Sequence, residues 1–141
     1  MKNKALIFVK SIIHGDEDDS IEVISDGYFI NKHSLAMAEY DESKVSGMEG
    51  THTSILIKKD SFKIIRSGNI ETEMEFKKKE RTACLYKTAN GIINIEIDTI
   101  DLTVNVDDCG GVIRCLYLLS IDGQVISRTS IVIKIKLKNI D

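Results

Sequence analysis

The strongest constraint on the fold of this chain is a regular alternation of apolar and polar residues along most of its length. It is clearest at positions 51–57 and again at the odd-numbered positions from 125 to 137, which share one face. Successive side chains of a β-strand point to opposite sides of the sheet, so this period of two predicts strands with one buried face. Proline is absent, and short polar turns separate the apolar runs. The chain is therefore predicted to consist of consecutive strands and tight turns.

The connections between the predicted strands are short. Asn90-Gly91 is typical of a two-residue hairpin turn, and Lys59-Asp60 and Asp122-Gly123 mark further turns. Because such links join neighbouring antiparallel strands, we predict an all-β, antiparallel, up-and-down, lipocalin-like β-barrel of about eight to ten strands, and not a Greek-key sandwich. Residues 33–40 contain helix-favouring residues, but so short a segment is marginal as a helix, and we expect a strand there. Residues 1–141 are expected to form a single barrel domain.

The composition narrows the classes of function. A formal net charge of −3 disfavours nucleic acid as a partner, because its binding proteins usually carry a basic stripe. The apolar run Ala5–Val9 is stopped by Lys10 and is too short for a signal peptide or a membrane span. We therefore expect a cytoplasmic protein that does not bind membranes. The three cysteines lack a Cys-x-x-Cys pair and are expected to be free thiols.

Motifs for catalysis or cofactor binding are not apparent. The three histidines lie on separate segments without the spacing of metal ligands, so no metal site is expected. The sequence has no nucleophile elbow and no phosphate-binding loop. An enzymatic function stays open but is less favoured than binding, and no cofactor is expected.

The most distinctive stretch extends from Tyr40 to Ile57, where a polar turn with two glycines leads into a cleanly alternating strand. Counting alternate positions places Thr51 and Thr53 on the inward face of this strand and Arg66 on the inward face of the next. The candidate ligand-binding residues, all expected in the barrel interior, are Arg66, Glu49, Thr51, Thr53, Glu42, Tyr40, Met74 and Phe76.

Arg66 has two interpretations. An arginine that faces a core needs a partner, because an isolated buried charge is very unfavourable. The partner can be internal, with Glu49 favoured over Glu42 because Glu49 shares the parity of the inward strand positions that follow it. Alternatively, Arg66 awaits the carboxylate or phosphate of a ligand, which arginine binds bidentately. The sequence leaves both interpretations open.

A set of short motifs spans nearly the whole chain: Tyr40-Asp-Glu-Ser43, Gly47-Met-Glu-Gly-Thr51, Thr53, Ile65-Arg66-Ser-Gly68, Met74, Phe76, Arg81, Gly91 and the long last strand. In these motifs the chain resembles the YwiB-like proteins, a bacterial domain of unknown function in the calycin, or lipocalin-like, superfamily. It departs from the family pattern at Ala89-Asn90, where Thr-Pro is expected before the glycine, so that turn is expected to differ in shape. The resemblance implies a barrel but brings no established activity.

Two functions remain as hypotheses. One is the binding of a small amphipathic or anionic ligand inside the barrel, as in many calycins. The other is a non-enzymatic protein-interaction module with a filled interior. The interior discriminates between them, because a small-molecule site needs a concave space of roughly 300 Å³ or more with a few polar groups. The sequence does not indicate the oligomeric state.

Overall fold

The computed structural model of the protein describes residues 2–138, which form ten β-strands and one short 3₁₀ helix. The elements are β1 (Asn3–His14), β2 (Asp19–Lys32), β3 (Leu35–Asp41), η1 (Lys44–Ser46), β4 (Thr51–Ile57), β5 (Ser61–Gly68), β6 (Glu71–Lys77), β7 (Arg81–Thr88), β8 (Gly91–Asp107), β9 (Gly110–Ile121) and β10 (Gln124–Leu137). No helix among these residues is long and apolar enough to cross a membrane.

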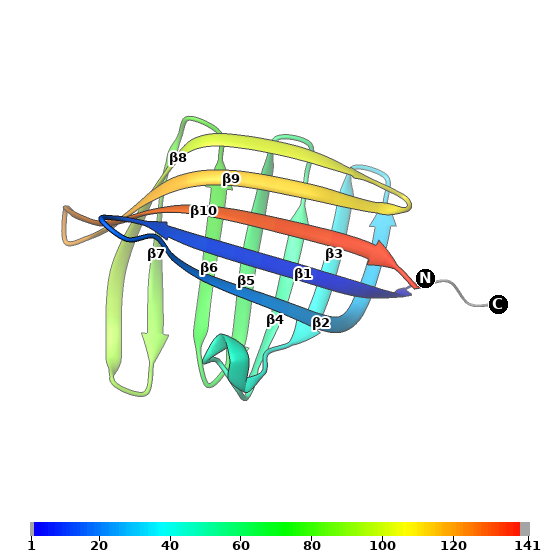
Figure 1. Ribbon diagram of the computed structural model, residues 1–141, viewed down its shortest axis with the longest axis horizontal. Coiled ribbons are helices and arrows are strands. Elements are labelled where there is room, and N and C mark those ends of the chain that lie inside the picture. Colours follow the sequence, from blue (N-terminus) through cyan, green and yellow to red (C-terminus); the bar gives the residue numbers. More distant parts are fainter. Residues whose placement is uncertain (1, 139–141) are drawn as a thin grey trace.

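Each strand pairs with its neighbours in the sequence, always antiparallel, and β10 closes the barrel by pairing with β1. In Figure 1, β1, β2, β9 and β10 run across the front, and β3 to β7 stand behind them at a steep angle. The predicted up-and-down antiparallel barrel is confirmed. Residues 35–41 form β3, so the strand expected near positions 33–40 is also confirmed, and η1 lies after it.

The interior differs between the two ends of the barrel. Because strand direction alternates, the β2–β3, β4–β5, β6–β7 and β8–β9 turns lie at one end, which we call the apolar end. Large, fully buried side chains occupy it: Ile7, Phe29, Phe62, Phe76, Ile113 and Ile133. The other end, beside the β1–β2, β3–β4, β5–β6, β7–β8 and β9–β10 connections, is the polar end. Its buried or part-buried inward side chains include Tyr40, Glu42, Thr51, Thr53, Arg66, Thr72 and Thr129.

Two β-bulges change which residues point inward. The bulge between Thr99 and Asp101 lets Thr99 and Leu102 both be buried on the inner side of β8. The apolar residues before the bulge, at 93–97, and those after it, at 102–106, therefore belong to one long strand. The bulge between Val125 and Ser127 shifts the register of β10, and Val125 is 57% exposed. The prediction that Val125 shares the inward face of the later residues of β10 is therefore wrong, because one extra residue reverses the alternation.

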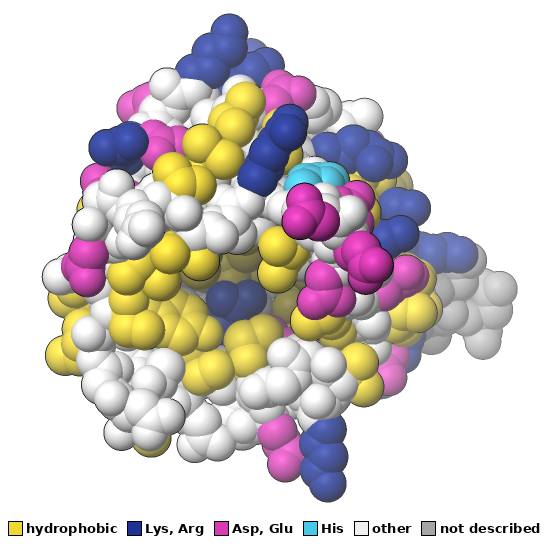
Figure 2. Space-filling view, turned by 60° about the vertical axis from the view of Figure 1, so that its left-hand side comes forward, with side chains coloured by type: hydrophobic (Ala, Val, Ile, Leu, Met, Phe, Trp, Pro, Cys, Tyr) yellow, Lys and Arg dark blue, Asp and Glu magenta, His cyan; other side chains and the backbone are white. Residues whose placement is uncertain are grey.

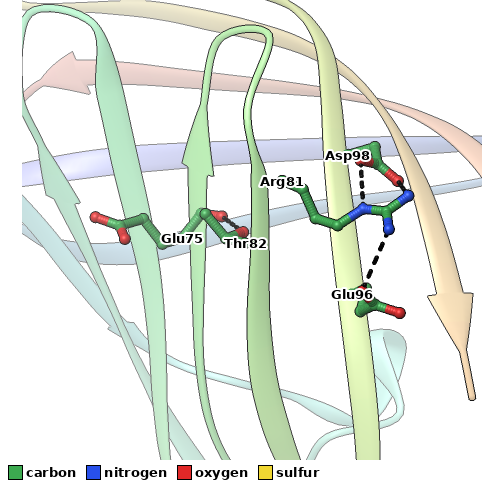
Figure 3. A network of polar contacts seen from close by, with 5 residues as sticks. All are labelled: Glu75, Arg81, Thr82, Glu96 and Asp98. Carbon is green, nitrogen blue, oxygen red and sulfur yellow. Dashed lines mark hydrogen bonds and ion pairs between the residues drawn. The ribbon is translucent and has the colours of Figure 1, made fainter. Parts of the chain in front are cut away.

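The barrel wall opens between β6 and β7. These strands pair only at Glu71–Lys87 and Thr72–Tyr86. Farther along, the Thr82 hydroxyl donates a hydrogen bond across the gap to the Glu75 carbonyl oxygen at 2.5 Å (Figure 3). A groove of about 500 Å³ lies over this opening.

Candidate functional site

Arg66 lies in the barrel interior at the polar end because β5 alternates regularly. Phe62 and Ile64 precede it at spacings of two and are 1% and 4% exposed. Arg66 pairs across the sheet with Thr53 on β4 and with Thr72 on β6, and both threonines are buried. The Arg66 side chain is 15% exposed, so most of a permanently charged group lies inside the barrel.

The carboxylate that approaches Arg66 belongs to Glu42. Its Oε2 atom lies 4.0 Å from the Arg66 Nε atom, and the Glu42 side chain is 2% exposed. The backbone explains this position, because the Glu42 amide donates to the Thr51 carbonyl oxygen at 2.8 Å and so extends the β3–β4 ladder by one residue. The inward alternation of Ala38 and Tyr40 therefore continues to Glu42.

The prediction that Glu49 pairs with Arg66 is wrong. Glu49 is exposed, and its backbone carbonyl accepts a hydrogen bond from the Asn69 side chain at 2.9 Å. The parity count fails because the chain turns before β4 begins. The Thr51 amide donates to the Met48 carbonyl in that turn, and Gly50 has a φ of 85°, which glycine adopts without strain.

Arg66 is close to Glu42 but is not hydrogen-bonded to it. The Arg66 Nε atom is buried and has no hydrogen-bond partner among residues 2–138. The Nη1 atom donates only to the Met74 sulfur at 3.8 Å, and sulfur is a weak acceptor. The Glu42 carboxylate instead accepts a hydrogen bond of 2.5 Å from the Thr53 hydroxyl. The guanidinium group therefore keeps most of its capacity to donate hydrogen bonds.

Two buried phenols share the electrostatic environment of Arg66. Burial raises the pKa of Tyr40 well above its ordinary value, the Glu42 carboxylate raises it further, and the positive charge of Arg66 opposes the shift. Burial also raises the pKa of Tyr117, where Arg66 again opposes the shift. Both phenols therefore stay neutral at physiological pH and can donate a hydrogen bond.

A small cavity lies beside Arg66. Its volume is about 100 Å³, and its lining includes Ile21, Tyr40, Glu42, Ser46, Met48 and Arg66. This is about a third of the space that a whole ligand was expected to need. Three larger hollows, of about 330 to 500 Å³, are lined chiefly by outward-facing or turn residues. A fourth, of about 340 Å³, lies at the apolar end between the β2–β3 and β4–β5 turns and the inward-facing side chains beside them, among them Ala36, Ile57 and Val104.

The polar end of the barrel is open, and its mouth is apolar. Ile13, Ile21 and Ile93 are placed by alternation on the inner side of their strands, yet they are 46%, 50% and 39% exposed. Figure 2 looks towards this end and shows a hollow walled by hydrophobic side chains, with basic atoms at its floor. The arrangement combines a cationic floor with an apolar rim.

The other predicted site residues divide between the site and the core. Thr51 is 2% exposed, and its hydroxyl has no hydrogen-bond partner among the described residues. Met74 contacts Arg66 through its sulfur. Phe76 belongs to the apolar core, where its ring stacks on Phe62 with centroids 4.5 Å apart and meets the edge of Tyr117 at 5.0 Å.

Some residues near the site were not among the sequence candidates. Tyr117 is one, because both faces of residues 112–121 are apolar in the sequence and its direction could not be chosen. In the structure, Tyr117 pairs with Thr99 on β8 and with Thr129 on β10, and it points inward with them. Arg114 therefore points outward, and it is exposed. Ile21 and Met48 also line the cavity, but no sequence motif distinguishes them.

Groups for metal or acyl-transfer chemistry are not assembled in the described part of the chain. Residues 2–138 contain no cluster of three or more potential metal ligands. On the outer surface, His14 Nε2 lies 2.7 Å from the Ser130 hydroxyl, and His14 Nδ1 lies 3.5 Å from Asp18. Ser130, however, pairs with both β1 and β9, so its backbone is engaged in the sheet. The Ser130 amide is therefore not free to stabilise an oxyanion.

Comparison with known proteins identifies relatives of unknown function. Residues 7–133 match a family described as a domain of unknown function, DUF1934. The crystal structure of the YwiB protein from Bacillus subtilis has the same fold, with a TM-score of 0.86 and 19% sequence identity over 98% of this chain and 94% of that one. No curated protein matches the sequence significantly. The resemblance to the YwiB-like proteins is confirmed.

Proposed function

This chain belongs to the DUF1934 family, and because that family is described only as a domain of unknown function, we propose a function from the geometry of the barrel. The protein binds a small amphipathic molecule through an anionic head group that contacts Arg66. The apolar part of the molecule lies in the mouth of the polar end.

The incompletely satisfied guanidinium group of Arg66 carries this proposal. A buried donor without an acceptor is destabilising by about 1 to 3 kcal/mol, and more when the group is charged. Arg66 has a carboxylate 4.0 Å away, a weak sulfur acceptor and a buried Nε atom without a partner. A carboxylate or phosphate oxygen would satisfy the free donors of the terminal nitrogens, which arginine presents as a planar fork.

The size of the cavity limits what enters. A water molecule occupies about 30 Å³ of liquid, so a cavity of about 100 Å³ has room for a head group and one or two carbons. The rest of the ligand must lie outside this cavity, against the exposed side chains of Ile13, Ile21 and Ile93. Burying these side chains under an apolar chain is favourable by about 25 cal/mol per Å².

Glu42 tunes the same site. Its buried carboxylate lies on the Nε side of Arg66, so a ligand anion must approach the terminal nitrogens instead. The negative charge of Glu42 also disfavours a head group with two charges, because like charges repel strongly in a partly desolvated site. The site is therefore suited to a singly charged head group such as a carboxylate.

The test compares octanoate with octanol, which share a chain but differ in charge, by isothermal titration at neutral pH. The wild-type protein should bind octanoate about tenfold or more tightly, because a charge-assisted hydrogen bond contributes about 1.5 to 3 kcal/mol. Arg66→Met should abolish this preference. Arg128→Met, which removes an exposed arginine from the outer surface, should preserve it.

A second variant keeps the test decisive if Arg66→Met is poorly folded. Glu42→Gln removes a negative charge near the head group while leaving Arg66 in place, so it should increase the affinity for octanoate and leave that for octanol unchanged. Equal binding of octanoate and octanol by the wild type, or a preference that survives Arg66→Met in folded protein, would overturn the proposal.

A further inference from the structure

The outer face of β1, β10 and β9 is unusual for the outside of a barrel, because apolar and basic side chains are interleaved on it. Cross-strand pairing places Lys10 beside Val132 and Val132 beside Arg114, so a valine lies between two cations. In the next row, Phe8 is beside Lys134. We define the basic–apolar face as Phe8, Lys10, Ile12, Arg114, Val132 and Lys134. In Figure 1 its strands β1, β9 and β10 cross the front of the barrel.

The cations of this face are not neutralised by the protein itself. None of Lys10, Arg114 and Lys134 has an acidic partner within 4.0 Å among the described residues, and all three are exposed. Glu22 pairs with Lys10 in the β1–β2 register but forms no such contact. Three unpaired cations therefore lie close together on this face, although the net charge of the chain is −3.

The outer face of β5 to β8 shows the opposite arrangement. Lys63 contacts Glu73 at 3.1 Å, and Lys77 contacts Glu75 at 3.8 Å. Arg81 donates to both carboxylate oxygens of Asp98, at 2.9 and 3.0 Å, and lies 3.5 Å from Glu96 (Figure 3). Three of the four outward-facing cations of these strands are therefore neutralised within the protein, and Lys87 on β7 is the exception.

The basic–apolar face is also hollowed. A groove of about 330 Å³ is lined by all six of its residues and by Glu22. Phe8, Ile12 and Val132 are only partly covered, which leaves apolar surface between the three cations. A concave surface of this kind accommodates side chains that project from a partner.

We propose that the basic–apolar face docks a segment of another protein in which acidic and apolar side chains alternate. Charge complementarity requires an acidic occupant, because positive patches attract negative ones and repel like charges. A second copy presenting the same face would bring like charges together. Nucleic acid would use aromatic stacking, of which this face offers only Phe8, and a flat bilayer surface fits a groove less well than projecting side chains.

The test uses the full-length protein and a fluorescein-labelled decapeptide in which glutamate alternates with valine, with binding followed by fluorescence anisotropy. The counterpart peptide with lysine in place of glutamate is the charge control. The wild-type protein should bind only the acidic peptide. Lys10→Glu/Lys134→Glu should weaken binding about tenfold or more, since two attractive charges become repulsive.

Matched variants separate a specific site from general charge. Lys59→Glu/Lys87→Glu makes the same change in net charge at exposed positions elsewhere and should leave binding unchanged. Val132→Ser, which keeps every charge, should weaken binding because it removes apolar contact from the middle of the face. The milder Lys10→Gln/Lys134→Gln provides the charge test if the glutamate pair does not fold.

Several outcomes would overturn the proposal. They are an absence of binding by the acidic peptide, an equal loss in the Lys59/Lys87 control, and no effect of Val132→Ser. Binding to vesicles of phosphatidylglycerol and phosphatidylcholine or to a thymidine oligonucleotide in place of the peptide would assign the face to a membrane or to nucleic acid. Self-association that is lost in Lys10→Glu/Lys134→Glu would assign it to a second copy of the chain.

Discussion

The two ends of the barrel interior are built from the same alternating strands but differ in what fills them. At the apolar end, Phe62 and Phe76 stack and are at most 1% exposed. At the polar end, inward positions hold Arg66 and Glu42, and the isoleucines of the mouth stay 39–50% exposed. The alternation of period two determines which side chains point inward. Whether those side chains fill the barrel interior depends on their size and polarity. One end is therefore filled by packed side chains, and the other keeps exposed apolar side chains around a buried charge.

The largest expected effect is a loss of stability on substitution at the apolar end, compared with a substitution at the mouth of the polar end. Phe76→Ala at the apolar end should lower the free energy of unfolding by about 3 to 5 kcal/mol, because it leaves a cavity and removes ring contacts with Phe62 and Tyr117. Ile21→Ala at the mouth should lower it by less than about 1 kcal/mol, since that side chain is 50% exposed. Urea unfolding of both variants measures the difference. Similar losses at the two positions would show that the mouth is part of the stabilising core.

The next effect concerns the charged groups of the polar end. Arg66→Met should be destabilising by about 1 to 3 kcal/mol, because it leaves the Glu42 carboxylate buried without its neighbouring cation. Glu42→Gln in the same background should recover part of that loss. Thermal or urea unfolding of the two single variants and the double variant gives the coupling energy, expected at about 0.5 to 3 kcal/mol for groups in contact. Strictly additive effects would mean that the two charges do not stabilise each other.

The sequence predicted the barrel and the direction of Arg66 for one reason. Within an uninterrupted strand, alternation is strict, and β5 runs without a bulge from Phe62 to Arg66. The inward positions of Thr51 and Thr53 on β4 follow from the same rule, and the structure buries both. Local pattern and global fold agree wherever the ladder is regular.

The errors occur where the ladder is interrupted. Counting back from β4 to Glu49 crosses the turn at Gly50, whereas counting forward along β3 from Tyr40 reaches Glu42 without a break. The bulge before Ser127 turned Val125 outward for a similar reason. The opening between β6 and β7 was not predicted, because both strands alternate well and the sequence does not reveal how far apart neighbouring strands lie. Interruptions depend on backbone geometry and long-range pairing, which a residue pattern does not encode.

The smallest expected effect is a pH dependence of stability that distinguishes the buried thiol of Cys115 from the exposed thiol of Cys109. Burial, with the negative charge of Asp101, raises the pKa of the Cys115 thiol from about 9 to about 12. The folded protein therefore holds this proton more tightly than the unfolded chain. Its contribution to stability is complete below about pH 9 and is lost progressively as the pH rises towards 12. By pH 10 the loss should be about 1 kcal/mol.

Urea unfolding at pH 8 and pH 10 isolates this contribution. Stability should fall between the two pH values by about 1 kcal/mol more in the wild type than in Cys115→Ala, because only the wild type has the shifted thiol. Comparing slopes removes the constant loss caused by the smaller side chain, and the phenol of Tyr40, whose pKa is also raised, contributes equally to both proteins. The pKa of Tyr117 is raised chiefly by burial and further by Cys115, so the measured difference includes the effect of the thiolate charge on this phenol. Cys109→Ser, at the exposed β8–β9 turn, should follow the wild type. Parallel curves for the wild type and Cys115→Ala would show that the thiol ionises as readily in the barrel wall as in the unfolded chain, and the wall around Cys115 would then have to admit water.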